Sequence, residues 1–150
     1  MIVDASVVID AVADPGPRGV AARAALAVVP AAEPLTAPGH FAFEVMSGLA
    51  AAASRPSHPL QSAELSAALQ DAQSFEITIE ATPWADIHRA WALAQASLRY
   101  ADAVYVAAAE RHNTALLTAD ARIGRSGAPI GCEIIIVTPP SAGRARTASG

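Results

Sequence analysis

The stretch ADAVYVAAAERHNTALLTAD, residues 101–120, decides how the rest of the chain is interpreted. Its pattern predicts an apolar helix that opens at Asp102, a short turn, and an apolar strand that is followed directly by Asp120. Ligands of a parallel sheet bind in the crevice beyond the carboxyl ends of its strands, so Asp120 is expected where such a sheet carries its functional groups. Two carboxylates therefore bracket one helix and one strand.

Asp102 begins the side of its helix that is expected to be buried. Tyr105, Val106 and Ala109 follow it by three, four and seven residues, a spacing that places all of them on one helical face. A cap favoured by the helix dipole is the alternative role for this carboxylate. Capping alone does not explain why an acid begins the buried side.

Two more carboxylates lie upstream. Asp4 follows an apolar strand at residues 1–3 and opens a helix, where an N-cap role and a functional role are equally plausible. Glu44 lies at the edge of the apolar face of a helix predicted over residues 40–54, and desolvating it there is costly unless it is paired, hydrogen-bonded or bound to a metal. A functional role for Glu44 is therefore favoured over that of an ordinary boundary residue.

The predicted elements repeat as strand followed by helix. Further strands are predicted at 35–37, 75–79 and 132–137, and the alternating pattern of 75–79 suits an edge of the sheet. This order requires a mainly parallel sheet with helices on both faces, which is an α/β, three-layer architecture. The length of 150 residues suits one domain, predicted over 1–138, and residues 139–150 are expected to be a disordered tail.

Thr82 and Pro83 are predicted to start a helix, with threonine as the cap and proline at the first helical position. Aromatic residues in this helix recur at core spacing, so they are assigned to packing rather than to a platform for stacking nucleobases. The stripe that we expect to be buried consists of Trp84, Ile87, Trp91 and Leu98.

Composition excludes several classes. All 10 basic residues are arginine, and without lysine the chain can be neither a P-loop protein nor a haloacid-dehalogenase-like phosphatase or receiver domain. No G-x-G-x-x-G, G-x-S-x-G or H-E-x-x-H pattern occurs, and the single Cys132 makes neither a disulfide nor a zinc site. The apolar runs are too short to span a membrane and the first strand leaves no room for a signal peptide, so a soluble, cytoplasmic protein is expected.

Four carboxylates in one partly buried site would raise one another's pKa unless a cation were present. Oxygen-only donors select Mg²⁺ or Mn²⁺, and a water on such an ion can attack a phosphorus atom. This predicts hydrolysis of phosphodiester bonds. Ser6 and Thr118 are candidates for the hydrogen bonds that orient the carboxylates.

Four motifs carry a resemblance to a known family: IVDASVVID, FEV, RYADAVYVAAAE and LLTADARI. In order and spacing they resemble the acidic motifs of PIN-domain ribonucleases, specifically the VapC toxins of bacterial toxin-antitoxin pairs. The resemblance implies a PIN-like (Rossmann-like) fold, Mg²⁺- or Mn²⁺-dependent cleavage of RNA, a cognate VapB-type antitoxin and a homodimer. It implies that the catalytic residues are Asp4, Glu44, Asp102 and Asp120, of which Asp4, Asp102 and Asp120 would bind the metal.

The formal net charge of -4 departs from what an RNA-binding protein usually carries. RNA would be held by a few arginines, with Arg99, Arg122 and Arg125 nearest to the motifs. Two alternatives stay open: a PIN-like domain that mainly binds RNA or a partner with little catalysis, and a metal-dependent DNA or flap nuclease.

Overall fold

The computed structural model describes residues 1–28 and 33–139. The predicted tail therefore lies outside the described residues, except for Pro139. Within the described part, no helix is both long and apolar enough to cross a membrane.

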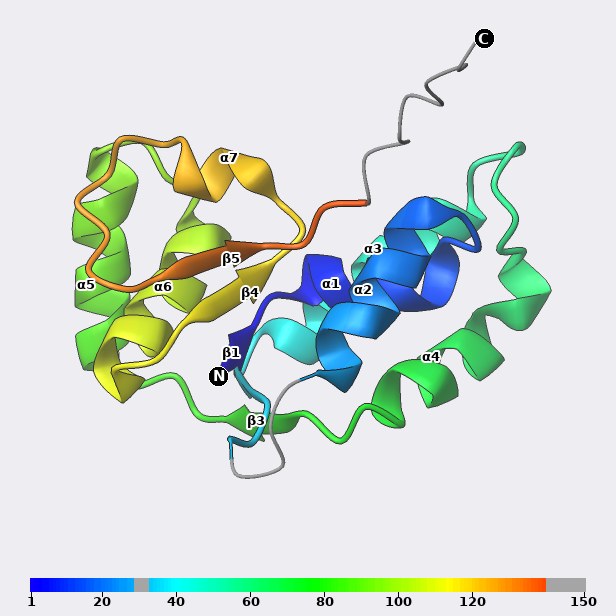
Figure 1. Ribbon diagram of the computed structural model, residues 1–150, viewed down its shortest axis with the longest axis horizontal. Coiled ribbons are helices and arrows are strands. Elements are labelled where there is room, and N and C mark those ends of the chain that lie inside the picture. The colour runs from blue at the N-terminus through cyan, green and yellow to red at the C-terminus, as the bar shows by residue number, and fades with distance from the viewer. Residues whose placement is uncertain (29–32, 140–150) are drawn as a thin grey trace, which may run out of the picture.

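The core of the fold is a five-stranded sheet with the order β3-β2-β1-β4-β5 (Figure 1). All four pairings are parallel, which confirms the predicted α/β class, and the 75–79 region does contribute an edge strand. Each strand is only two or three residues long. Their bounds are β1 (Ile2–Val3), β2 (Thr36–Pro38), β3 (Thr78–Glu80), β4 (Leu116–Thr118) and β5 (Ile134–Ile136).

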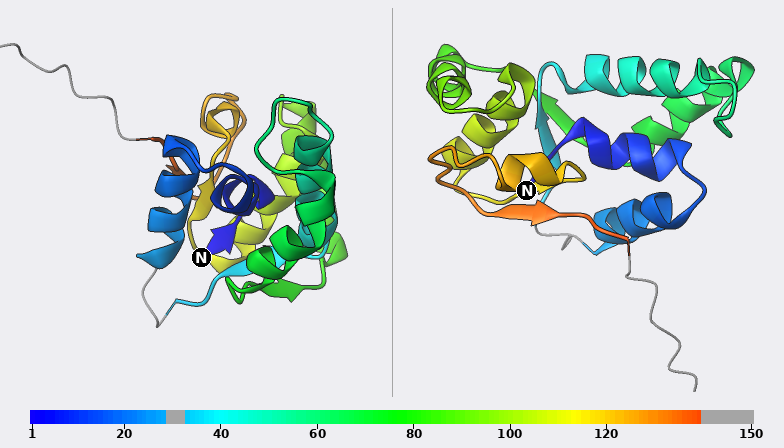
Figure 2. Two further views of the ribbon diagram at one scale, coloured as in Figure 1. Left: turned by 90° about the vertical axis from the view of Figure 1, so that its right-hand side faces the viewer. Right: turned by 90° about the horizontal axis from the view of Figure 1, so that it is seen from above.

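Helices connect and cover the strands (Figure 2). The four helices of the N-terminal half of the chain, α1 to α4, form one group beside the sheet (Figure 1). Helix α6 packs directly on β1, β2 and β4, and α5 packs against α6. A 3₁₀ turn at Ser62–Glu64 precedes α4. The helices are α1 (Ala5–Ala13), α2 (Pro17–Ala27), α3 (Phe41–Ala53), α4 (Leu65–Gln73), α5 (Trp84–Gln95), α6 (Tyr100–His112) and α7 (Ala121–Gly124).

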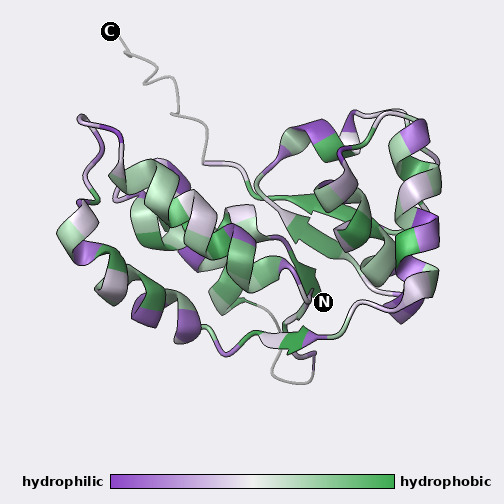
Figure 3. Cartoon of the chain, turned by 180° about the vertical axis from the view of Figure 1, so that it is seen from behind, coloured by the Kyte–Doolittle hydropathy of each residue, from purple (hydrophilic) through white to green (hydrophobic). Residues whose placement is uncertain are grey.

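Small side chains allow α6 to approach the sheet closely. Its buried residues include Ala103, Ala107, Ala108 and Ala109. The strands that it covers are largely hydrophobic (Figure 3). The helix ends at Asn113, whose backbone adopts the left-handed conformation (φ 50°) that asparagine tolerates at a helix terminus. Helix α6 thereby delivers the chain into strand β4, which lies between the central strand β1 and the edge strand β5.

The prediction of the buried face of α5 was wrong. Trp84 and Trp91 are 78% and 58% exposed and Ile87 is exposed as well, so only Leu98 of the predicted stripe is buried. Thr82 does not cap the helix either, because Pro83 occupies the N-cap position. The Thr82 hydroxyl instead accepts a hydrogen bond from the backbone N–H of Gly39, 3.1 Å away.

A different set of residues faces α6. The residues of α5 that are buried are Asp86, Ala90 and Leu93. Asp86 is paired with the Arg111 guanidinium, whose Nε lies 3.0 Å from each carboxylate oxygen. A buried carboxylate is tolerated only with such a partner, so an ion pair and small side chains join the two helices and leave the aromatic side outside.

Candidate active site

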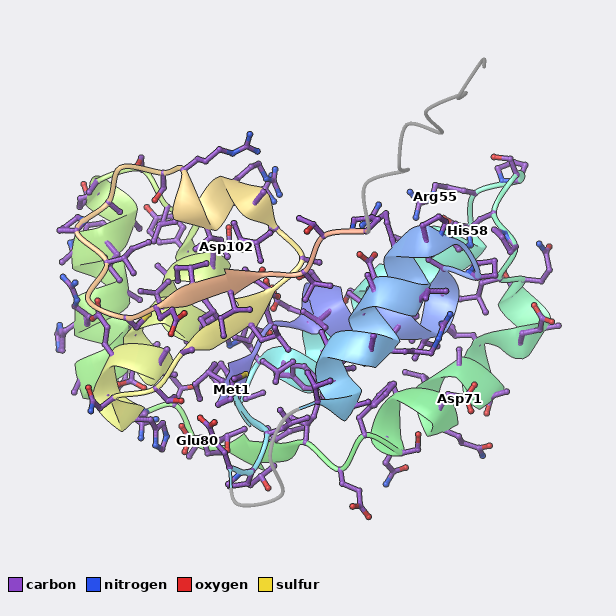
Figure 4. All side chains as sticks on the ribbon, in the orientation of Figure 1. Met1, Arg55, His58, Asp71, Glu80 and Asp102 are labelled. Atoms are coloured by element: carbon purple, nitrogen blue, oxygen red, sulfur yellow. The ribbon has the colours of Figure 1, made fainter. Side chains whose placement is uncertain are left out.

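All four acids singled out in the sequence line one cavity of about 410 Å³. Parallel strands β1 and β4 end beside each other, which brings Asp4 and Asp120 to the same edge of the sheet. Glu44 reaches the cavity from the first turn of α3, and Asp102 from the first turn of α6. Asp102 lies between the sheet and α7 in Figure 4.

Asp4 is held by contacts on both carboxylate oxygens. Oδ1 accepts a hydrogen bond from the backbone N–H of Ser6, 3.0 Å away, so Asp4 does serve as the N-cap of α1. Oδ2 accepts a hydrogen bond from the Thr118 hydroxyl, 2.5 Å away. The cap and the cavity therefore use the same buried side chain.

Thr118 and Ser6 join the end of β4 to the start of α1. The Thr118 hydroxyl accepts from the backbone N–H of Asp120 at 3.0 Å, and the Ser6 hydroxyl accepts from the backbone N–H of Ala119 at the same distance. The two hydroxyl oxygens lie 3.4 Å apart. Both residues therefore contact the backbone or side chains that carry Asp4 and Asp120.

The Asp102 carboxyl group is partly buried in the acidic cavity. Burial raises its pKa to about 6, and the nearby charges of Asp4 and Asp120 add to this effect, while the Arg99 guanidinium opposes it. Like charges disfavour ionisation because each carboxylate repels the next. The cavity thus concentrates more negative charge than its own arginines neutralise.

Asp120 is engaged by its neighbour Arg122. The Nε of Arg122 lies 2.8 and 2.9 Å from the two carboxylate oxygens, and its Nη2 also contacts Oδ2. This hydrogen bonding lowers the pKa of Asp120. Asp120 also caps α7 by accepting from the backbone N–H of Arg122 at 2.9 Å.

Glu44 is bound from the protein interior. The hydroxyl of Tyr105 donates a hydrogen bond to its Oε2 atom at 2.7 Å, and the Nε2 atom of His40 lies 3.5 Å from the same oxygen. Sequence reasoning linked neither residue to Glu44, and it assigned Tyr105 to packing alone. A tyrosine on the buried face of a helix could have indicated this contact, since a buried tyrosine hydroxyl usually has a hydrogen-bond partner.

The three candidate RNA-binding arginines differ in position. Arg99 and Arg122 line the acidic cavity. Arg125 does not, and its guanidinium donates to the backbone carbonyl of Ala121 at 3.2 Å. The structure therefore brings two of the three to the acids.

The donor set suits a hard divalent cation, since every candidate ligand is a carboxylate oxygen. Among the residues that the structure describes, however, no three acidic, histidine or cysteine side chains already converge on a common metal position. Asp120 is occupied by Arg122 and Glu44 by Tyr105. The repulsion at Asp102 is nevertheless of the kind that a cation relieves, so the residues fit such an ion once Asp120 is released from its arginine.

The chain is thus an α/β domain with short parallel strands, and four carboxylates line a cavity at the carboxyl ends of these strands. The PIN domain family model matches residues 1–128, and the chain belongs to the PIN domain family. The resemblance drawn from its acidic motifs is thereby confirmed at the level of family and fold. None of the curated proteins matches the chain significantly.

Two solved structures share this fold. The Mycobacterium tuberculosis toxin VapC20, described as cleaving the sarcin-ricin loop, is 15% identical, with a TM-score of 0.65 over 93% of this chain and 98% of its own. A toxin-antitoxin complex from Klebsiella pneumoniae contains a chain that is 21% identical, with a TM-score of 0.64 and the same coverage. At these identities the likeness concerns the fold.

Proposed function

We propose that this PIN domain is a metal-dependent endoribonuclease and the toxin of a VapBC-type toxin-antitoxin pair. The observation that carries the proposal is the meeting of all four acids in one cavity at the carboxyl edge of the sheet. Structural capping would explain Asp4 and Asp120, but it does not explain Glu44 and Asp102, which come from two other helices. The fold of VapC20 and of the Klebsiella complex supports the same class.

In this proposal Asp4, Asp102 and Asp120 hold Mg²⁺ or Mn²⁺. The bound ion would supply an activated water and neutralise charge on the phosphate. Thr118 and Ser6 keep the Asp4 carboxylate oriented through the contacts described above. Arg99 and Arg122 supply the positive charge that attracts the RNA backbone to an otherwise acidic cavity.

The test is cleavage of RNA by the purified, antitoxin-free protein in Mn²⁺ or Mg²⁺. Asp4→Asn and Asp102→Asn are expected to abolish cleavage, and asparagine at position 4 still caps the helix. Asp71→Asn is the matched control, because this exposed acid lies on α4 outside the acidic cavity. Undiminished cleavage by the two site variants would refute the proposal.

Single-stranded and duplex DNA are included as substrates. Preferential cleavage of DNA would favour a DNA or flap nuclease using the same acids. Tight RNA binding without turnover in either metal would favour the domain that acts mainly by binding.

The proposed partners are a VapB-type antitoxin and a second copy of the chain. An antitoxin partner is supported by the Klebsiella structure, which is a toxin-antitoxin complex, and co-purification with the product of an adjacent small gene would test this. The homodimer is supported by the exposed aromatic side of α5, where Trp84, Ile87 and Trp91 project from one helix. Exposed apolar patches of this kind mark interaction surfaces.

A further inference from the structure

Tyr105 couples the protein interior to one of the four acids. Its side chain is 1% exposed and lies on the face of α6 that is turned inward. Its hydroxyl donates to Glu44 Oε2 at 2.7 Å, and burial together with this bond raises the pKa of the phenol, which keeps it a donor. The tyrosine therefore fills the core with its ring and contacts the cavity wall with its oxygen.

His40 converges on the same oxygen from the N-cap position of α3. Its ring lies 4.7 Å from the Tyr105 ring, centroid to centroid, at an interplanar angle of 55°. The Nε2 atom is buried, lies 3.5 Å from Glu44 Oε2, and has no hydrogen-bond partner within the described part of the chain. The Tyr105 hydroxyl thus donates a hydrogen bond to Oε2 and the His40 ring lies beside the same oxygen, while Oε1 makes no hydrogen bond to the described residues.

Glu44 needs such support more than the other acids do. Asp4 has a short side chain that is fixed by the Thr118 hydroxyl and a backbone N–H. Glu44 carries one more rotatable bond and projects from a separate helix, so without a partner it would sample several rotamers. A carboxylate that acts on a substrate has to be held within a fraction of an ångström of its working position.

We propose that Tyr105, assisted by His40, is a positioning residue that orients the Glu44 carboxylate in the acidic cavity. The role of Glu44 in catalysis rests on the proposed function. The orientation of Glu44 does not, since it follows from contacts within the protein alone. Tyr105 itself does not line the cavity, and it acts only through Glu44.

The first test is Tyr105→Phe, which keeps the ring and removes the hydroxyl. We expect kcat for RNA cleavage to fall about 10- to 100-fold with KM unchanged, the size of effect typical of residues that orient the groups of a metal site. Tyr100→Phe is the matched control, because it removes the other tyrosine hydroxyl from an exposed side chain, and its kcat should equal that of the wild type. Unchanged kcat in folded Tyr105→Phe would overturn the proposal.

A double-mutant cycle separates positioning from general loosening of the core. In a Glu44→Ala background, Tyr105→Phe should have no further effect on kcat, because the group that it orients is gone. An equal loss in both backgrounds would indicate a merely structural role and would also overturn the proposal. If Tyr105→Phe does not fold, His40→Ala takes its place in the same cycle, since His40 is partly exposed and contacts the same oxygen.

Crystal structures of the wild type and Tyr105→Phe provide a readout that needs no activity. The Glu44 side chain should leave its wild-type rotamer or become disordered in the variant, and an unmoved carboxylate would overturn the proposal. A wild-type protein that cleaves no RNA would refute the proposed function, whereas the rotamer of Glu44 would still decide whether Tyr105 positions it.

Discussion

The ionised Asp102 carboxylate destabilises the folded protein. The carboxyl group is partly buried beside other acids, and its pKa of about 6 means that ionisation is disfavoured in the folded state. The opposite holds for Asp120, whose charge is compensated by Arg122. The two acids therefore contribute to the cavity in different ways: one carries unrelieved charge, and the other carries a charge with its counterion in place.

Replacing Asp102 with asparagine should stabilise the metal-free protein above pH 6. The folded state holds a proton on Asp102 up to about pH 6 and the unfolded state only to 3.8, so the wild type loses stability as pH rises through this window. The full shift is discounted because the group is partly exposed, which leaves a gain of about 1–2 kcal/mol in the free energy of unfolding. Urea denaturation in a chelating buffer, at a series of pH values from 4 to 8, measures the difference.

The two proteins should be equally stable near pH 4. A difference that is independent of pH would mean that the charge of Asp102 is not its cause. Addition of Mn²⁺ should stabilise the wild type more than the variant, because a ligand that binds only the folded state raises its stability.

Asp4 and Asp120 could be predicted as candidates because each follows a strand directly, and Glu44 and Asp102 because each lies beside the apolar face of a helix. Their side-chain partners could not. The pairing of Asp120 with Arg122 depends on the turn into α7, and that of Glu44 with Tyr105 joins residues 61 positions apart. Spacing along α6 predicts that Tyr105 is buried. It does not show that the residue of α3 against it is Glu44.

The junctions of β1 with α1 and of β4 with α7 are tied together by one threonine. Thr118 is fully buried at the end of β4, donates to Asp4 and accepts from the backbone of Asp120. Neighbouring parallel strands are thereby joined by side-chain contacts at the point where their backbone pairing ends. The edge of the sheet that carries the acids is also the edge that these hydrogen bonds stabilise.

Thr118→Val should destabilise the protein by about 1–3 kcal/mol, because the isosteric side chain leaves buried polar groups without their partners. Thr118→Ser is the control, since it keeps the hydroxyl and loses one methyl group, at a cost of about 1 kcal/mol. Chemical denaturation gives both values. A serine variant that is less stable than the valine variant would assign the role of Thr118 to its methyl group instead.

The periodicity of the sequence predicts helix α5 but not which side of it is buried. Its position, type and approximate bounds follow from the sequence, and so does the parallel sheet around it. Its orientation does not, because Trp84, Ile87 and Trp91 have the spacing of a core stripe and also that of a surface stripe. The side of α5 that faces α6 carries Asp86, which is buried and paired with Arg111.

The distribution of exposed apolar residues over the whole molecule is uneven. Trp91 stacks on Tyr100, with ring centroids 5.9 Å apart and planes 14° from parallel, and both rings are largely exposed. Phe43 and Met46 are exposed on α3, and Phe43 also lines the acidic cavity. A monomer would leave these aromatic groups in water, which supports the proposed second copy.

Sedimentation equilibrium should find a dimer for the wild type and a weakened one for Trp91→Glu. Aromatic residues that dominate an interface typically change affinity by at least about 30-fold on replacement. Trp91→Phe, which keeps an aromatic ring, is the matched control and should dimerise more tightly than the glutamate variant. A strictly monomeric wild type, or a Trp91→Glu dimer as tight as the wild type, would contradict this assignment.

The unrelieved charge at Asp102 also has a consequence for how such a gene would change under selection. If the protein harms its host when it is active, inactivating alleles are favoured, and most random lesions achieve this by unfolding the chain. A substitution that neutralises Asp102 would inactivate the site and stabilise the folded protein. The inactive allele would therefore still produce an abundant, folded protein. Such a silent copy would still present the same surface to a partner, and could compete with active copies for it.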